Sequence, residues 1–266
     1  MQPTEGTAYV NGAQLHYQMA GQGPALVLIH GNTLDTRMWD DQVQAFAEQY
    51  RVIRYDMRGF GRSAPPTGEP YTPADDLAAL LIYLGVEHAH ILGLSLGGAV
   101  AIDFVLAYPQ MTDALILADA GLREFEWREY GEFSAAVRTA AIESGVESAR
   151  RHWLDGALFA PALAQPQVAA RLRQMVGDYS GWHWLNKDSW RPSEIAASEQ
   201  LESVDAPALV IVGERDLVDF HQIADILHRS IPAASKAVVA GVGHMVNMEE
   251  PAQFNSLVLD FLAGQR

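Results

Sequence analysis

A serine at position 95 stands in the pattern Gly-x-Ser-x-Gly, formed by Gly93, Ser95 and Gly97. An apolar run at residues 90–93 precedes it and an apolar-periodic segment at 99–107 follows, which predicts a strand, a sharp turn and a helix. Glycines on both sides suit a turn that crowds the backbone and holds the serine in an unusual conformation. The helix that follows would aim its N-terminal amides at negative charge developing near Ser95. An isolated serine between glycines is usually a loop residue, but this context favours a nucleophile.

A serine hydroxyl is a weak nucleophile at neutral pH and needs an adjacent base. Most of the nine histidines fall in edge-like strands, on a predicted surface helix or in the middle segment of the chain. His244 differs, because it ends the loop Gly-Val-Gly-His at residues 241–244, directly after a predicted strand at 236–240. In open α/β sheets, ligands bind beyond the carboxyl ends of the strands. We therefore predict that His244 is the base.

The base needs an acidic partner that fixes its tautomer and stabilises its charge. Asp216 follows the predicted strand 208–212 in the stretch Gly-Glu-Arg-Asp. Asp119, Glu214 and Asp219 are alternatives, and Asp119 is the strongest of them because it also ends a strand near the serine. We favour Asp216, which gives the chain order serine, aspartate, histidine.

Acyl transfer also requires hydrogen-bond donors for the developing oxyanion. The backbone N–H of Leu96, the residue after the serine, is one candidate. The loop after the apolar run at residues 25–29 reads His30-Gly31-Asn32, and we predict that the N–H of Asn32 is the second donor. The alternative is a simple tight turn after a buried strand.

Strand-like and helical patterns alternate along most of the chain, which predicts an α/β fold with mostly parallel strands and helices on both faces of the sheet. An Asn-Gly pair at residues 11–12 predicts a hairpin at the start. The further expected strands are 25–29, 51–55, 90–93, 113–118, 208–212 and 236–240, and the expected helices are 37–49, 72–84, 219–229 and 250–262.

Composition excludes several classes of function. The net charge of −15 argues against nucleic acid or an anionic membrane surface as a partner. The absence of cysteine excludes thiolate metal sites and cysteine nucleophiles. No stretch is apolar for long enough to span a bilayer, and no secretory signal is visible, so we expect a cytoplasmic protein. No His, Asp or Glu spacing suggests a metal, and the chemistry requires no cofactor.

Between residues 122 and 200 the alternation stops and helical patterns recur, which predicts a helical insertion over the sheet. Residues 121–200 hold 9 basic and 11 acidic residues, a near balance that favours a solvated face over a site for an anionic substrate. Trp182, Trp184 and Trp190 are candidates for lining a substrate pocket, although aromatic residues in helical segments more often pack a core.

Taken together, these motifs resemble the α/β-hydrolase superfamily. The resemblance covers nearly the whole chain outside the insertion and rests on four ordered motifs: His30-Gly31, the Asp56 to Ser63 turn, the Ser95 turn, and Asp216 with His244. It implies an eight-stranded twisted sheet with a core domain at residues 1–121 and 201–266 and a helical cap at 122–200. It also implies that the Asp56 to Ser63 turn is structural.

The resemblance further implies a serine hydrolase of the carboxylesterase or enol-lactone hydrolase type, acting on a small-molecule ester or lactone. A serine at position 95 excludes the dehalogenase and epoxide hydrolase branches, which use an aspartate there, even though Asn32 also occurs in dehalogenases. One alternative is a carbon–carbon bond hydrolase of a dienoate or β-diketone substrate. Another is a non-catalytic ligand receptor or interaction protein on the same fold.

Overall fold

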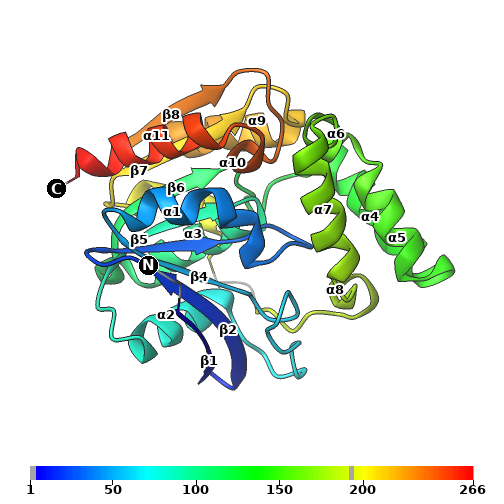
Figure 1. Cartoon of the computed structure of the whole chain (residues 1–266), viewed down its shortest axis with the longest axis horizontal. Helices are drawn as coiled ribbons and strands as arrows, with labels where there is room; N and C mark the ends of the chain where they lie inside the picture. Colours follow the sequence, from blue (N-terminus) through cyan, green and yellow to red (C-terminus); the bar gives the residue numbers. More distant parts are fainter. Residues whose placement is uncertain (1–3, 192–194, 266) are drawn as a thin grey trace.

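An eight-stranded sheet forms the centre of the protein in this computed structural model, which describes residues 4–191 and 195–265 (Figure 1). The strand order is β1-β2-β4-β3-β5-β6-β7-β8; β1 pairs with β2 and β2 with β4 in antiparallel fashion, and all other pairs are parallel. The strands are β1 (Thr4–Val10), β2 (Ala13–Ala20), β3 (Ala25–Ile29), β4 (Arg51–Tyr55), β5 (Ala89–Leu94), β6 (Thr112–Ala118), β7 (Ala208–Gly213) and β8 (Ala234–Val239). The predicted α/β class and eight-stranded sheet are confirmed.

The inner strands are apolar because both of their faces are covered. Every residue of β3, β5 and β7 is buried, as expected for parallel strands between two layers of helices. The β1–β2 hairpin turns at Asn11 and Gly12, whose φ angles of 48° and 70° match the turn that an Asn-Gly pair favours.

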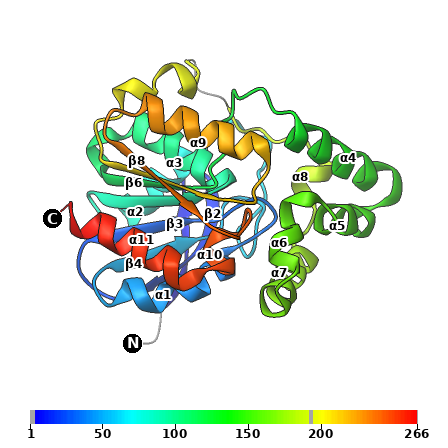
Figure 2. The ribbon, with the colours of Figure 1, turned by 90° about the horizontal axis from the view of Figure 1, so that it is seen from above.

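Helices cover both faces of the sheet (Figure 2). α1 (Asp40–Ala47) and α11 (Pro251–Ala263) lie on one face, and α3 (Leu96–Ala107) and α9 (Val218–Ser230) lie on the other. α2 (Pro73–Tyr83) packs beside α3, and the short α10 (Val246–Glu249) leads into α11. The predicted start of α2 is borne out, since Thr72 accepts a hydrogen bond from the N–H of Asp75 at 3.0 Å and Pro73 is the first helical residue.

The segment between β6 and β7 is helical and projects from one end of the sheet in both views (Figures 1 and 2). It contains α4 (Glu129–Ser144), α5 (Val146–Leu154), α6 (Ala160–Leu163), α7 (Pro166–Asp178) and α8 (Trp182–Leu185). Its described residues form no strand beyond an isolated bridge between Tyr71 and Trp190. No helix in the described part of the chain has the length and apolarity that crossing a bilayer requires.

Polar contacts join this helical segment to the loops at the end of the sheet. Arg37, just before α1, donates to Asp178 at the end of α7 at 2.8 Å. Asp219 in α9 accepts hydrogen bonds from the backbone N–H groups of Arg128 and Tyr130 at 3.1 and 2.9 Å. These contacts fix where the start of α4 lies relative to the sheet.

The turn from Asp56 to Ser63 is built from buried polar groups. The Asp56 carboxylate accepts hydrogen bonds from the N–H groups of Thr36 and Arg62, each at 2.8 Å. Arg58 donates to both oxygens of Asp76 at 2.6 and 2.7 Å and to the carbonyl of Asn11 at 2.7 Å. These contacts tie β4 to the first hairpin and α2, which supports the structural interpretation of this turn.

The Arg58–Asp76 pair gives the first testable prediction. Both side chains are almost fully buried, and burial raises the pKa of Asp76 even though Arg58 acts in the opposite direction. Replacing Arg58 by Met leaves a buried carboxylate without its counterion, so we expect R58M to lower the free energy of unfolding by about 3–5 kcal/mol in urea titrations. The exposed Arg62–Glu5 pair provides the control, since water screens this pair and R62M should destabilise the protein far less than R58M. Equal losses in the two variants would contradict this account.

Candidate active site

Ser95 lies at the sharp turn between β5 and α3, in the conformation that the Gly-x-Ser-x-Gly pattern predicts. Its φ is 57° and its ψ is −116°, a strained combination for a residue with a side chain. The turn is held because the Ser95 N–H donates to the carbonyl of Ala118 at 3.0 Å. The Ser95 carbonyl in turn accepts from Gly98 and Gly121 at 2.9 Å each.

The glycines beside the serine are required by close packing. A Cβ on Gly93 would collide with the carbonyl of Gly97, and a Cβ on Gly97 would collide with the carbonyls of Ile29 and His30 at the end of β3. The start of α3 therefore packs against the sheet at a distance that only glycine permits. This packing holds the Ser95 turn beside the loop after β3.

His244 and Asp216 form a hydrogen-bonded pair. His244 Nδ1 lies 2.8 Å from Asp216 Oδ2, and the Asp216 side chain is fully buried. The other carboxylate oxygen of Asp216 accepts from the N–H of Leu217 at 2.8 Å. His244 lines one narrow gap together with Ser95 and Asn32. The structure thus brings three strand-end loops, after β5, β7 and β8, to a common point.

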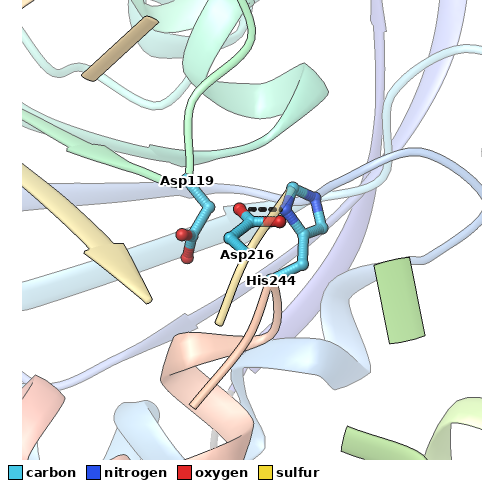
Figure 3. A group of neighbouring side chains, drawn as sticks. All are labelled: Asp119, Asp216 and His244. Carbon is cyan, nitrogen blue, oxygen red and sulfur yellow. Dashed lines mark hydrogen bonds and ion pairs between the residues drawn. The ribbon is translucent and has the colours of Figure 1, made fainter. Parts of the chain in front are cut away.

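Asp119, the alternative acid, lies beside Asp216 at the end of β6 (Figure 3). Its Oδ1 accepts from the N–H of Gly213 at 2.8 Å, and its buried Oδ2 accepts from no N–H or hydroxyl donor among the described residues. Burial first, and then the neighbouring Asp216 carboxylate, raises the pKa of Asp119 well above its ordinary value. Two adjacent buried carboxyl groups cannot both ionise cheaply, and the raised pKa shows that this cost falls on Asp119.

The ligand atoms of Asp119, Asp216 and His244 all lie within 4.8 Å of one another, a spacing that a metal site could also have. Their hydrogen bonds commit them to other partners. His244 Nδ1 lies 2.8 Å from Asp216 Oδ2, and an Nδ1–H donated to this carboxylate would leave the nitrogen no free lone pair for a metal. Asp119 accepts a hydrogen bond from a backbone amide, and the neighbouring Asp216 helps to raise its pKa, which disfavours the carboxylate form that a metal would need. This donor set fits a proton-transfer pair better than a metal centre.

The predicted oxyanion donors lie beside the serine. Leu96 is the first residue of α3, so its N–H has no acceptor within the helix. In the part of the chain described by the structure, the N–H of Asn32 makes no hydrogen bond either, and Asn32 lines both the gap and a larger cavity with Ser95. The loop before Asn32 is fixed by His30, whose Nε2 accepts from the N–H of Met57 at 3.0 Å.

Glu249 anchors the loop that carries His244. This residue was not identified from the sequence. Its carboxylate accepts hydrogen bonds from the N–H groups of Gly243 and Met245, the residues on either side of His244, at 2.9 and 3.1 Å. Burial raises the pKa of Glu249, while these two hydrogen bonds act to lower it. The sequence spacing of His244 and Glu249 did not predict this interaction, because the short helix α10 is what brings the Glu249 carboxylate back to the loop.

A cavity of about 390 Å³ opens at Ser95, between the sheet and the helical segment. It is mainly apolar and aromatic, and its lining includes Met57, Phe60, Tyr71, Trp127, Tyr130, Trp190 and Phe220. Sequence reasoning missed Trp127 and Tyr130. Burial raises the pKa of Tyr130, and a hydrogen bond with the side chain of Asn32 partly offsets this effect. Tyr130 therefore reaches from α4 to the loop that carries the predicted oxyanion donor.

Of the three tryptophans predicted to line the pocket, the structure places only Trp190 in the cavity wall. Trp184 is instead buried between Tyr179 and Trp153, with ring centroids 5.0 and 6.2 Å away, and Trp182 also lies outside the lining. The reason is the single turn of α8, which directs His183 rather than its neighbours toward the cavity. His183 stacks on Phe60 at 4.3 Å, and burial lowers its pKa to about 4.

The fold and the strand-end loops define an α/β hydrolase. A family model described as "alpha/beta hydrolase fold" matches residues 24–251, and the chain belongs to this family. The chain is 27% identical to a carboxylesterase of Bacillus subtilis, over 91% of this chain and 81% of the relative. It is 28% identical to 3-oxoadipate enol-lactonase 2 of Acinetobacter baylyi, over 92% of this chain and 91% of the relative. Among solved structures, the enol-lactonase of Burkholderia xenovorans aligns with a TM-score of 0.85 at 26% identity, covering 97% of this chain and all of that one.

The raised pKa of Asp119 predicts a particular pH dependence of stability. A carboxyl group whose pKa is raised on folding stabilises the native state at low pH, and this contribution is lost as the pH rises toward the folded pKa. Replacing Asp119 by Asn removes the titration and keeps the acceptor for Gly213. Relative to wild type, D119N should therefore gain up to about 1.4 kcal/mol of unfolding free energy per pH unit above pH ~4.

The measurement is a series of urea titrations between pH 4.5 and 8.5 on wild type and D119N. Asp260 on the exposed face of α11 provides a matched control, since D260N should show no such slope. A difference between D119N and wild type that stays constant with pH would show that Asp119 is ionised.

Proposed function

We propose that this protein is a serine hydrolase that cleaves small-molecule carboxylic esters or lactones through an acyl-enzyme on Ser95. The observation that carries the proposal is the His244–Asp216 hydrogen bond at a gap that Ser95 also lines. The kinship with carboxylesterases and enol-lactonases supports the same class of reaction. A cytoplasmic location remains a prediction from the sequence.

In the proposed mechanism, His244 Nε2 takes the proton of the Ser95 hydroxyl as the oxygen attacks the carbonyl carbon. Asp216 keeps the Nδ1 proton in place and stabilises the imidazolium that forms. The tetrahedral intermediate then collapses, the ester C–O bond breaks, and the imidazolium gives its proton to the leaving alkoxide. Water repeats the attack on the acyl-enzyme with His244 again as base, which releases the acid and restores Ser95.

The negative charge of the intermediate would be held by the N–H groups of Asn32 and Leu96. Both donors are backbone groups on packed elements, so they need little rearrangement when the charge develops. The positive end of the α3 dipole points at the same place. The strained Ser95 conformation contributes because it holds the side chain at the tip of the turn and not inside the helix.

The helical segment would act as a cap over the reaction, as predicted for residues 122–200. It supplies Trp127, Tyr130, His183 and Trp190 to the cavity wall, while the sheet side supplies the Ser95 turn. A cavity of about 390 Å³ suits a small molecule. Under this proposal, substrate choice is set by the cap and the chemistry by the strand-end loops.

The first test of the proposal is replacement of Ser95 by Ala. Without the nucleophile, kcat for a short 4-nitrophenyl ester should fall by about 10⁴-fold or more, and labelling by a fluorophosphonate should be lost. Circular dichroism and the melting temperature should match wild type within a few degrees, because Ser95 lies at the surface of the cavity. S256A on the exposed face of α11 is the control and should keep full activity. Substantial turnover by S95A would refute the acyl-enzyme, and a carbon–carbon hydrolase would reveal itself by preferring diketone or dienoate substrates in the same assay panel.

The second test separates the two candidate acids. D216N should lower kcat by roughly 10⁴-fold, because the amide favours the wrong histidine tautomer. D119N should keep kcat within about tenfold, since Asp119 bonds to the backbone of Gly213 while the hydrogen bond to His244 comes from Asp216. Steady-state kinetics at pH 7.5 with one ester would compare the two. The reverse order of effects would transfer the role of the acid to Asp119.

A further inference from the structure

Arg123 is a cation in the wall of the cavity, and the mechanism above does not use it. It follows β6 by five residues and lies two residues after Gly121, whose N–H donates to the Ser95 carbonyl. Two residues of extended chain span at most about 7 Å, so the backbone of Arg123 is close to the Ser95 turn. The guanidinium therefore lies within the reach of one small molecule bound at Ser95.

Arg123 has one ion-pair partner, Asp103, and this contact is long; burial raises the pKa of Asp103 to about 6, and Arg123 acts to lower it. The nearest carboxylate oxygen, Oδ2 of Asp103, is 3.7 Å from Arg123 Nη1, which is longer than a hydrogen bond. Nη1 is buried and has no hydrogen-bond partner among the described residues. A guanidinium carries five N–H donors, and a buried donor such as Nη1 that lacks an acceptor is costly. The other cavity arginine, Arg58, makes three short hydrogen bonds.

Stacking holds the Arg123 guanidinium in a fixed plane. Its central carbon lies 4.1 Å from the centroid of the Trp190 ring, which forms part of the cavity wall. The Trp190 backbone is itself anchored, because its N–H donates to Asp188 Oδ1 at 3.1 Å. A stacked guanidinium keeps its donors at its edge, where they can meet a planar acceptor without losing further side-chain entropy.

The acidic groups in the cavity wall, by contrast, are occupied. Asp76 accepts from Arg58 and Asn11, and Asp188 accepts from Tyr71 at 3.2 Å and from Trp190. His183 is uncharged at neutral pH because burial lowers its pKa to about 4, so it supplies no competing cation. Among the charged groups of the cavity wall in the described part of the chain, Arg123 is therefore the one whose ion-pair partner lies beyond a short hydrogen bond.

We infer that Arg123 binds a carboxylate of the substrate, which makes the substrate an ester or lactone that also carries a free carboxylate. Carboxylate is the planar anion that a guanidinium binds through two parallel hydrogen bonds. A protein with a net charge of −15 repels anions over long distances, so recognition of such a substrate requires a local cation of this kind. The inference rests on the proposed function, and it replaces the solvated-face interpretation for this one basic residue.

The test compares two esters that differ only in the terminal group, 4-nitrophenyl hydrogen adipate and the neutral 4-nitrophenyl hexanoate. Replacing Arg123 by Gln should lower kcat/KM for the adipate ester by roughly 10- to 100-fold, the range expected for a charge-assisted pair. The hexanoate ester should change by less than about threefold. Equal losses for both esters would overturn the inference.

Two control variants separate a binding role from a structural ion pair. D103N removes the nearest carboxylate, so kcat/KM for the adipate ester should stay the same or rise if Arg123 serves the substrate. A loss as large as that in R123Q would mean that Arg123 and Asp103 merely hold each other, and would overturn the inference. R138Q, on the exposed surface of α4, makes the same charge change away from the cavity and should leave both esters unaffected.

A binding experiment makes the result independent of turnover. Adipate should bind to S95A in calorimetric titrations, and the double variant S95A/R123Q should bind it at least about tenfold more weakly. If neither ester is cleaved but this difference in binding is seen, the proposed reaction fails and the carboxylate site stands. If the hexanoate ester is cleaved in a Ser95-dependent way but adipate binds equally to both variants, the carboxylate site fails and the hydrolase stands.

Discussion

The close approach of α3 to the ends of β3 and β5 is the constraint on which the rest of the site depends. Gly93 and Gly97 permit that approach. Three backbone hydrogen bonds hold Ser95 at its positive φ: its N–H donates to the carbonyl of Ala118, and its carbonyl accepts from Gly98 and Gly121. A side chain at either glycine would push α3 away from the sheet. The Ser95 turn would then no longer lie beside Asn32 and His244. Local strain at one residue is thus balanced by packing across three strands.

A second constraint is electrostatic and concerns the buried carboxyl groups behind His244. Asp216 has His244 on one side and Asp119 on the other, so its charge is set by both neighbours (Figure 3). The raised pKa of Asp119 disfavours a second negative charge beside Asp216, and the Asp216 carboxyl group in turn holds His244 at Nδ1. Glu249 fixes the backbone on both sides of the histidine. The buried carboxyl groups at the ends of β6, β7 and α10 therefore act as one network.

The fold was predictable from the sequence because its signals are local. Buried parallel strands appear as short apolar runs, as in β3 and β7, and the Asn-Gly turn and the Thr72-Pro73 helix start have their own residue signatures. The placement of Ser95, Asp216 and His244 followed from strand ends, since parallel strands deliver their loops to one edge. Glu249, Tyr130 and Arg123 were not predictable in this way, because their positions depend on how the helical segment and α10 pack in three dimensions. The sequence also could not separate Trp190 from Trp182 and Trp184. The single turn of α8 directs His183 to the cavity and keeps the two tryptophans of α8 out of its lining.

In the helical segment, the count of charged residues and the distances between individual charges lead to different conclusions. The acids and bases between residues 121 and 200 nearly cancel in number, and most of those that the structure describes are exposed. At the cavity, what matters is the distance between each charged group and its partner of opposite charge. Arg58 and Asp76 neutralise each other within the wall, whereas Arg123 stacks on Trp190 and stays 3.7 Å from Asp103. One cation whose only ion pair is long, placed in an aromatic cavity, can therefore give a strongly acidic protein a local preference for an anionic ligand.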